Sequence, residues 1–168
     1  MNLHAKTLLT LAVLAVLLLV GVAWGWSAMT TPFPHKVQTK VCYPTVFQAG
    51  DRVSAPAVTV SVFNASDRVG LAESTMTAFE HQGFGPGRVG NAPKDAKVLY
   101  AQVWSADRSD PAVQLVASRL GPRAHIKSLQ HGGPGVVVMV GPEFTKLVSG
   151  KSSVKVGSTA TVCSPPSA

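Results

Sequence analysis

Histidine, cysteine and acidic residues are the side chains that most often catalyse reactions or bind metals, and this chain has few of them. Its 168 residues include 5 His, 2 Cys and 8 Asp or Glu. The histidines are scattered without metal-ligand spacing, at His4, His35, His81, His125 and His131. No two carboxylates lie in a pattern typical of paired acid–base chemistry. The sequence therefore predicts no catalytic residue, no metal site and no cofactor.

Three short motifs are similar to nucleotide or oxyanion sites, but their neighbours contradict such a role. Residues 85–90 match GxGxxG, yet a helix is expected before them and none after, the reverse of a dinucleotide site. We interpret them as a loop or a bulged strand. Gly150-Lys151-Ser152 lacks the first glycine of a P-loop, because Thr145 stands there. Residues 131–133 predict a hairpin turn, since no GxSxG nucleophile motif accompanies them.

Cys42 and Cys163 are the two cysteines, one near each end of the main body of the sequence. Outside the cytoplasm such thiols tend to oxidise. A bridge between them would close a loop of roughly 120 residues and stabilise the fold by up to about 5 kcal/mol. The alternative is two unpaired thiols or a bridge between two chains. We expect the intramolecular bridge, and the lack of a CxxC motif argues against redox catalysis.

The N-terminal segment contains 22 consecutive uncharged residues, from Thr7 to Ala28. A helix of this length can cross the roughly 30 Å hydrocarbon core of a bilayer. Lys6 precedes the run, and Trp24 and Trp26 lie near its end, where indole rings favour the membrane interface. We expect a single-pass anchor with the rest of the chain outside. A cleaved signal peptide is the alternative, although its apolar run is usually shorter.

Alternation of residue types predicts a half-buried strand over 57–63, with Val58, Val60 and Val62 facing the core. A turn follows, in which Ser66 or Asp67 can cap the next helix. Helical spacing predicts a buried stripe, and Gly83 ends the helix. That stripe consists of Val69, Ala72, Met76 and Phe79.

The second half of the chain predicts a similar succession of elements. Ser109-Asp110-Pro111 is a typical helix start, with proline at the first helical position, and Gly121 ends that helix. Its buried stripe contains Val113, Val116, Ala117 and Leu120. Strands are expected over 84–92, 98–104, 123–130 and 136–140. The first of these is Gly-rich and is expected at a sheet edge.

These elements predict an α+β fold in the order β-α-β-β-α-β-β, preceded by one transmembrane helix. It consists of a single sheet of four to five short strands with two helices packed on one face. We divide the chain into an N-terminal stub and anchor, a tether with an irregular lead-in segment, the domain, and a loosely held tail that the bridge ties back. Their ranges are 1–28, 29–56, 57–148 and 149–168.

Five landmarks of the sequence resemble those of the LytR C-terminal domain family. The first is Val60-Ser61-Val62-Phe63-Asn64-Ala65-Ser66-Asp67-Arg68-Val69-Gly70-Leu71-Ala72, a strand followed by a Gly-Leu-Ala helix start. The others are residues 82–84, 89–92, 98–100 and 136–144. In longer relatives this module follows a catalytic domain that attaches glycopolymers to peptidoglycan, and no segment here corresponds to it. The architecture is similar to that of actinobacterial envelope integrity proteins with a solitary domain of this kind.

The resemblance implies a non-catalytic domain on the extracytoplasmic side of the cell membrane that supports envelope integrity. The expected partners are the membrane, through the N-terminal helix, and an envelope polymer, lipid or envelope protein. A formal net charge of +7 favours acidic partners. Nucleic acid is not expected outside the cell, and the sequence does not indicate an oligomeric state. A small-ligand or lipid carrier and an unrecognised envelope hydrolase are the alternatives.

The candidate ligand-binding residues form the turn after the first predicted strand: Asn64, Ser66, Asp67 and Arg68. The competing interpretation is that these side chains serve only as cap and turn residues, because Asn and Ser readily bond the local backbone.

Overall fold

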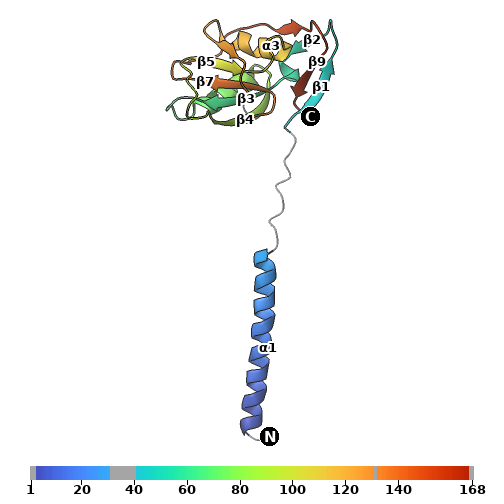
Figure 1. Cartoon of the computed structure of the whole chain (residues 1–168), viewed down its shortest axis with the longest axis vertical. Helices are drawn as coiled ribbons and strands as arrows, with labels where there is room; N and C mark the ends of the chain where they lie inside the picture. The colour runs from blue at the N-terminus through green and yellow to red at the C-terminus, as the bar shows by residue number, and fades with distance from the viewer. Residues whose placement is uncertain (1–2, 31–40, 131, 167–168) are drawn as a thin grey trace. The chain divides into compact units, whose positions relative to one another are not determined.

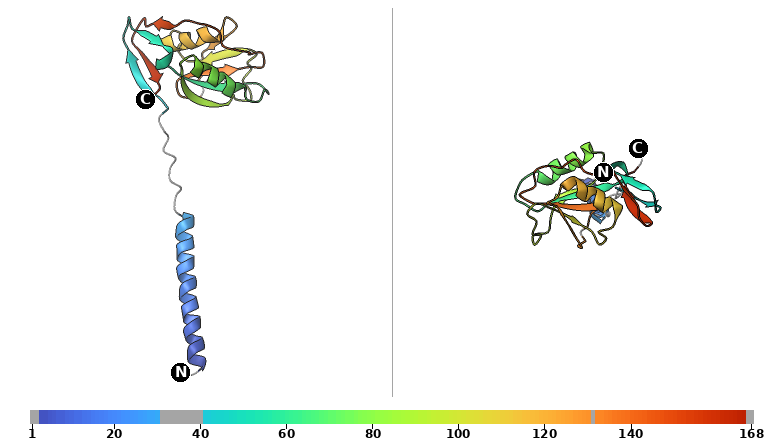
Figure 2. Two further views of the ribbon diagram at one scale, coloured as in Figure 1. Left: turned by 180° about the vertical axis from the view of Figure 1, so that it is seen from behind. Right: turned by 90° about the horizontal axis from the view of Figure 1, so that it is seen from above.

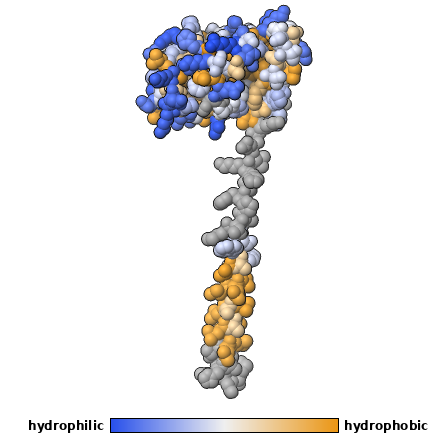
Figure 3. All heavy atoms as spheres, viewed as in Figure 1, coloured by the Kyte–Doolittle hydropathy of each residue, from blue (hydrophilic) through white to orange (hydrophobic). Residues whose placement is uncertain are grey.

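A computed structural model describes residues 3–30, 41–130 and 132–166, which belong to two units, Met1–Thr39 and Lys40–Ala168. The first unit contains helix α1 (Leu3–Thr30). Within it, Leu8–Ser27 is long and apolar enough to cross a membrane, with a mean hydropathy of 2.6. Figure 3 shows its side chains as an almost continuous hydrophobic surface. The predicted helix over residues 7–28 is confirmed, and it extends further at both ends.

The second unit is an α+β domain, as predicted (Figure 1). Its elements are β1 (Tyr43–Phe47), β2 (Arg52–Ser54), the 3-10 helix η1 (Ala55–Ala57), β3 (Thr59–Asn64), α2 (Leu71–His81), β4 (Gly85–Asn91), β5 (Ala101–Trp104), α3 (Pro111–Leu120), β6 (His125–Lys127), β7 (Val136–Val140), β8 (Ser153–Lys155) and β9 (Ala160–Ser164). From β3 to β7 they follow the predicted order.

The central sheet has five strands in the order β4-β3-β7-β5-β6. Two β-α-β units build it, because β3 pairs in parallel with β4 and β5 in parallel with β6. Strand β7 lies between the units, parallel to β3 and antiparallel to β5. As a result, β3, β4 and β7 end at the edge of the sheet where β5 and β6 begin.

Helices α2 and α3 pack on one face of this sheet, as predicted (Figure 2). Phe79 of α2 and Leu115 and Leu120 of α3 are fully buried in one cluster with the valines of β3 and β7 that face them. The opposite face is also covered: Phe63, Val137 and Met139 are buried there against Val98. The predicted strand with Val58, Val60 and Val62 in the core is confirmed, but it is not half-buried, because all of β3 except Asn64 is buried.

The start of α2 differs from the prediction. The N-cap is Gly70, which has a φ of 74°, and neither Ser66 nor Asp67 caps the helix. Val69 precedes the helix and is 101% exposed, so it does not belong to the buried stripe. The left-handed backbone at Gly70 explains the difference: it redirects the chain after Val69, and the helical periodicity begins only at Leu71.

The end of α2 is a Schellman motif. Gly83 has a φ of 86°, and its N–H donates to the Glu80 carbonyl at 2.8 Å. The Phe84 N–H donates to the Phe79 carbonyl at 3.1 Å, and the two rings meet edge to face at 5.3 Å. Both hydrogen bonds and the accompanying apolar contact are those of the motif, and they confirm the predicted stop at Gly83.

Both segments that flank the family-like region are folded, contrary to expectation. Residues 41–56 were expected to be irregular, yet they contain β1, β2 and part of η1. The tail was expected to be loosely held, yet β8 pairs with β2 and β9 with β1. Val154, Val156 and Val162 of the tail are buried in the main core. Sequence periodicity misses such short strands because their pairing partners lie more than 95 residues away.

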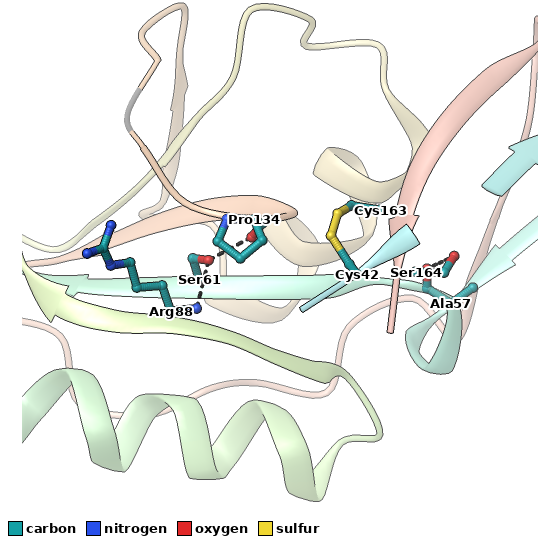
Figure 4. Close-up of a disulfide and its surroundings, with 7 residues drawn as sticks. All are labelled: Cys42, Ala57, Ser61, Arg88, Pro134, Cys163 and Ser164. Carbon is teal, nitrogen blue, oxygen red and sulfur yellow. Dashed lines mark hydrogen bonds between the residues drawn. A yellow bond between two sulfur atoms is a disulfide. The ribbon is translucent and has the colours of Figure 1, made fainter. Parts of the chain in front are cut away.

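Cys42 and Cys163 form a disulfide with a Cα–Cα distance of 5.4 Å, as predicted (Figure 4). The bridge links the two strands of the terminal ribbon β1–β9 at the end where β1 begins and β9 finishes. Beside it, the Ser164 hydroxyl donates to the Ala57 carbonyl at 2.8 Å, which attaches the ribbon to η1. Both ends of the domain are thus held against its body.

The glycine-rich residues 85–90 form edge strand β4, with a register shift opposite Val60 and Val62. This confirms the bulged-strand interpretation. The buried Ser61 hydroxyl accepts from the Arg88 N–H at 3.0 Å and donates to the Pro134 carbonyl at 2.6 Å (Figure 4). The expected hairpin turn at 131–133 is wrong, because β6 and β7 are separated by β5; His131 itself lies outside the described residues.

Candidate functional site

The four predicted site residues are the last residue of β3 and three residues of the turn after it, at the edge where the parallel strands finish. Strand β3 ends at Asn64, and the chain crosses over the sheet edge before α2 begins at Leu71. Asn91 lies opposite Asn64 in the register of β4. Turns at the carboxyl ends of parallel strands are common ligand sites in α/β proteins. Side chains that already bond the local backbone are less free to contact a ligand.

Asn64 and Ser66 bond each other and the turn itself. The Asn64 amide oxygen accepts from the Ser66 N–H at 2.9 Å and from the Ser66 hydroxyl at 2.7 Å. The Asn64 Nδ2 donates to the Arg68 carbonyl at 2.7 Å, and the Arg68 N–H donates to the Ser66 Oγ at 3.2 Å. This is the network of an Asx turn. The cap-and-turn interpretation therefore accounts for both residues.

Arg68 connects the turn to the segment that follows β7. Its Nη1 donates to the Phe144 carbonyl at 2.6 Å and to the Pro142 carbonyl at 3.2 Å. The Phe144 side chain is buried in the core. Arg68 thus holds residues 142–144 against the end of β3, which is a positioning role.

Asp67 is exposed, whereas Asn64 and Ser66 are half-buried. It lines two adjoining hollows of about 900 Å³ and 400 Å³. Both hollows are also lined by Asn64, Ser66 and Asn91. We call the two together the strand-end groove. Asn64, Ser66 and Asp67 thus line the same concave surface.

The segment after β4 forms the other wall of the strand-end groove, which no local sequence signal predicts. The larger hollow is lined there by Ala92, Pro93, Lys94, Ala96, Lys97, Val98 and Leu99. Lys97 and Leu99 also line a third hollow of about 310 Å³ that contains Arg123 and His125. Residues from two distant loops meet only because the β-α-β topology brings their strand ends to one edge.

The charges around the groove are of both signs. Lys94 and Lys97 are exposed on its wall, opposite Asp67. Arg123 forms an ion pair with Glu143 and lies over the Tyr100 ring, 4.5 Å from its centroid. The ion pair is exposed, so its contribution to stability is small. Lys94 and Lys97 face solvent, and within the described part of the chain neither forms an ion pair of this kind.

Two carboxyl groups with shifted pKa values, those of Asp107 and Asp110, lie away from this groove, near the start of α3. Burial raises the pKa of the Asp110 carboxyl. The backbone N–H groups of Ala112 and Val113 donate to this N-cap carboxylate and lower its pKa, but their effect is smaller. Hydrogen bonds from Ser109 lower the pKa of the exposed Asp107. Both carboxylates bond the backbone at the helix start, where Asp110 accepts from the Ala112 N–H and Asp107 from the Ser109 N–H, each at 2.7 Å. Within residues 3–30, 41–130 and 132–166, no three His, Cys, Asp or Glu side chains converge as metal ligands.

The geometry and the predicted landmarks agree with a comparison against protein families. The family described as "LytR cell envelope-related transcriptional attenuator" matches residues 57–144, slightly more than half of the chain. The chain belongs to the LytR_C family. No curated protein matches it. One similar solved structure is the soluble domain of a conserved hypothetical secreted protein from Mycobacterium marinum, with 24% sequence identity and a TM-score of 0.44, covering 62% of this chain and 80% of that chain.

The matched LytR_C segment contains β3 to β7 and the whole strand-end groove. LytR_C is a non-catalytic domain family. Strands β1, β2, β8 and β9 and both cysteines lie outside the match. The disulfide-closed ribbon is therefore an addition to the family segment in this chain.

Proposed function

We propose that this protein is a membrane-anchored, extracytoplasmic, non-catalytic module that supports cell envelope integrity. It binds an envelope polymer, lipid or envelope protein at the strand-end groove. The anchor is the α1 segment Leu8–Ser27, and the bound component is held close to the membrane. Asp67 contributes contacts to it, while Asn64, Ser66 and Arg68 maintain the shape of the groove.

The observation that carries this proposal is the combination, in one chain, of a membrane-length apolar helix and a disulfide-closed LytR_C domain. A disulfide persists in oxidising compartments, which supports a position outside the cytoplasm. The family description supports an envelope role. The groove is a concave surface with several polar groups, as binding sites commonly are.

The two alternatives receive less support. A carrier would need a cavity between sheet and helices, and that space is filled by Phe79, Leu115, Val116 and Leu120, all fully buried. A hydrolase would need converging polar groups with shifted pKa values. The raised pKa of Asp110 comes from the burial of a helix N-cap, which is a structural role.

A complementation experiment tests the binding role of the groove. In a strain that lacks the protein and shows increased envelope permeability, the Asp67→Ala variant is expected to restore the barrier poorly. Glu80→Ala is the matched control, because Glu80 is an exposed acidic residue on α2 away from the groove. Both variants are compared at equal abundance and equal melting temperature. Full restoration by Asp67→Ala would remove Asp67 from the site.

A further inference from the structure

Two large apolar side chains at the strand-end groove extend into solvent. Val69 is 101% exposed and lines the smaller hollow, and Leu99 is 72% exposed and lines the larger one. Single exposed apolar residues are ordinary on protein surfaces. Here two of them flank one concave surface, between which lie Asn64, Ser66, Asp67 and Asn91. Such an arrangement favours a partner that removes apolar surface from water.

Lysines accompany these apolar side chains. Lys94 and Lys97 line the same hollow as Leu99, and His125 lines the adjoining one. Lysine side chains can place an ammonium group at headgroup level while their apolar stems lie along a surface. Asp67 and the neighbouring Asp95 are acidic, so the net charge here is small. The contact therefore depends mainly on Val69 and Leu99, and the lysines add a smaller attraction to anionic groups.

The covalent connection to α1 restricts the distance between this domain and a bilayer that holds α1. Twelve residues separate Thr30 from Tyr43, and a chain of that length spans at most about 45 Å. A domain of about 130 residues has a radius of gyration of about 14 Å. A bilayer that contains α1 is thus always within reach, and this high effective concentration makes even a weak contact significant.

We propose that the strand-end groove docks onto the lipid surface of the membrane that holds the anchor. Val69 and Leu99 enter the interfacial region, and Lys94 and Lys97 contact lipid phosphates. This inference rests on the proposed function and names the partner of its site. A hydrophilic wall polymer would leave the two apolar side chains without a role, whereas a lipid interface buries them.

Hydrogen exchange of the full chain in lipid nanodiscs tests the docking. The amides around residues 65–70 and 96–100 are expected to exchange several-fold more slowly in the wild type than in a Val69→Ser, Leu99→Ser double variant. Adding phosphatidylglycerol to phosphatidylcholine discs should strengthen this protection, and Lys94→Gln with Lys97→Gln should remove that increase. Val46→Ser is the matched control, because Val46 is 57% exposed on β1 and should not change the protection.

The outcomes separate the anchor from the docking surface. If the chain does not co-elute with nanodiscs, the anchor and the proposed function both fail. If it co-elutes and these amides exchange equally fast in the wild type and the double serine variant, the docking proposal is overturned and the anchor remains. Protection that arises only after purified wall polymer or an envelope protein is added would also overturn it, in favour of that partner.

Discussion

At the scale of single residues, polar side chains fix the loops that surround the strand-end groove. Arg68 reaches two carbonyls after β7, and Asn64 closes the turn after β3. These bonds fix backbone that lies beyond the ends of β3 and β7. Their loss should therefore affect the stability and shape of the groove before it affects any ligand contact.

Arg68→Ala is expected to lower the free energy of unfolding by about 1–2 kcal/mol, because two carbonyls lose a charged donor. Arg88→Ala is the control: its side chain is exposed, and its bond to Ser61 uses the backbone N–H. Urea unfolding of both variants measures the difference. Equal stabilities of the two would show that Arg68 does not hold residues 142–144.

Asp110 provides a second residue-scale prediction, through its cap. Asp110→Ala should cost about 0.5–2 kcal/mol, since the Ala112 N–H loses its acceptor, whereas Asp110→Asn keeps the cap and should cost less. The pKa of Asp110 is raised above its usual 3.8, so the folded state binds the proton more tightly than the unfolded state. Its stabilising contribution is present below the unfolded pKa and is lost as the pH rises through the folded pKa.

The free energy of unfolding of the wild type, relative to that of Asp110→Asn, should therefore decrease as the pH rises through the folded pKa of Asp110. Asp107 has the opposite shift but is common to both proteins, so it largely cancels. Urea unfolding at a series of pH values checks the trend. A wild-type advantage that grows with pH would contradict the direction of the shift.

At the scale of elements, the close approach of β3 and β4 depends on glycine. A Cβ on Gly87 would lie 2.6 Å from the Ser61 Oγ and 2.7 Å from the Val60 carbonyl oxygen. Backbone cannot yield as a flexible side chain can, so the bulge must open. Glycine at this position of the GxGxxG pattern thus serves strand packing.

Gly87→Ala is accordingly expected to destabilise the domain by roughly 1–3 kcal/mol, the usual cost of overpacking. Gly157→Ala is the matched control, because nothing lies within 4 Å of its added Cβ and it should be nearly neutral. Thermal unfolding of both variants measures the contrast. A Gly87→Ala variant as stable as the control would show that the strands separate freely.

The elements that the sequence predicts are those that local signals encode. Alternating valines, the Asp110-Pro111 start and the Gly83 stop are contained in a few neighbouring residues, and all three appear in the structure. The two terminal ribbons and the second wall of the groove depend on contacts between distant segments. Val69 was misassigned for the same reason, since only the backbone of Gly70 shows that the helix starts later.

At the scale of the whole molecule, the disulfide and the terminal ribbons close the LytR_C segment on itself. Cys42 and Cys163 are 121 residues apart in the sequence. Both short sheets, β1–β9 and β2–β8, pair the first part of the domain with its last. The domain that follows α1 is thus fixed at both of its ends.

Replacing both cysteines by serine should lower the free energy of unfolding by about 2–5 kcal/mol, because the unfolded chain gains freedom. Thermal unfolding of the oxidised wild type and of the double variant measures this difference. The double variant should also match the reduced wild type. Identical melting temperatures for all three would mean that the ribbons alone hold the ends.

The anchored envelope role requires the domain after α1 to lie outside the cytoplasm, and the orientation of the chain in the membrane can be measured. The measurement compares cells carrying the full chain fused after residue 168 to alkaline phosphatase, which is active only outside the cytoplasm, with cells carrying a fusion to β-galactosidase, which is active only inside. We expect an active phosphatase in the membrane fraction and an inactive β-galactosidase. Active β-galactosidase with inactive phosphatase would place the domain in the cytoplasm and contradict the anchored envelope role.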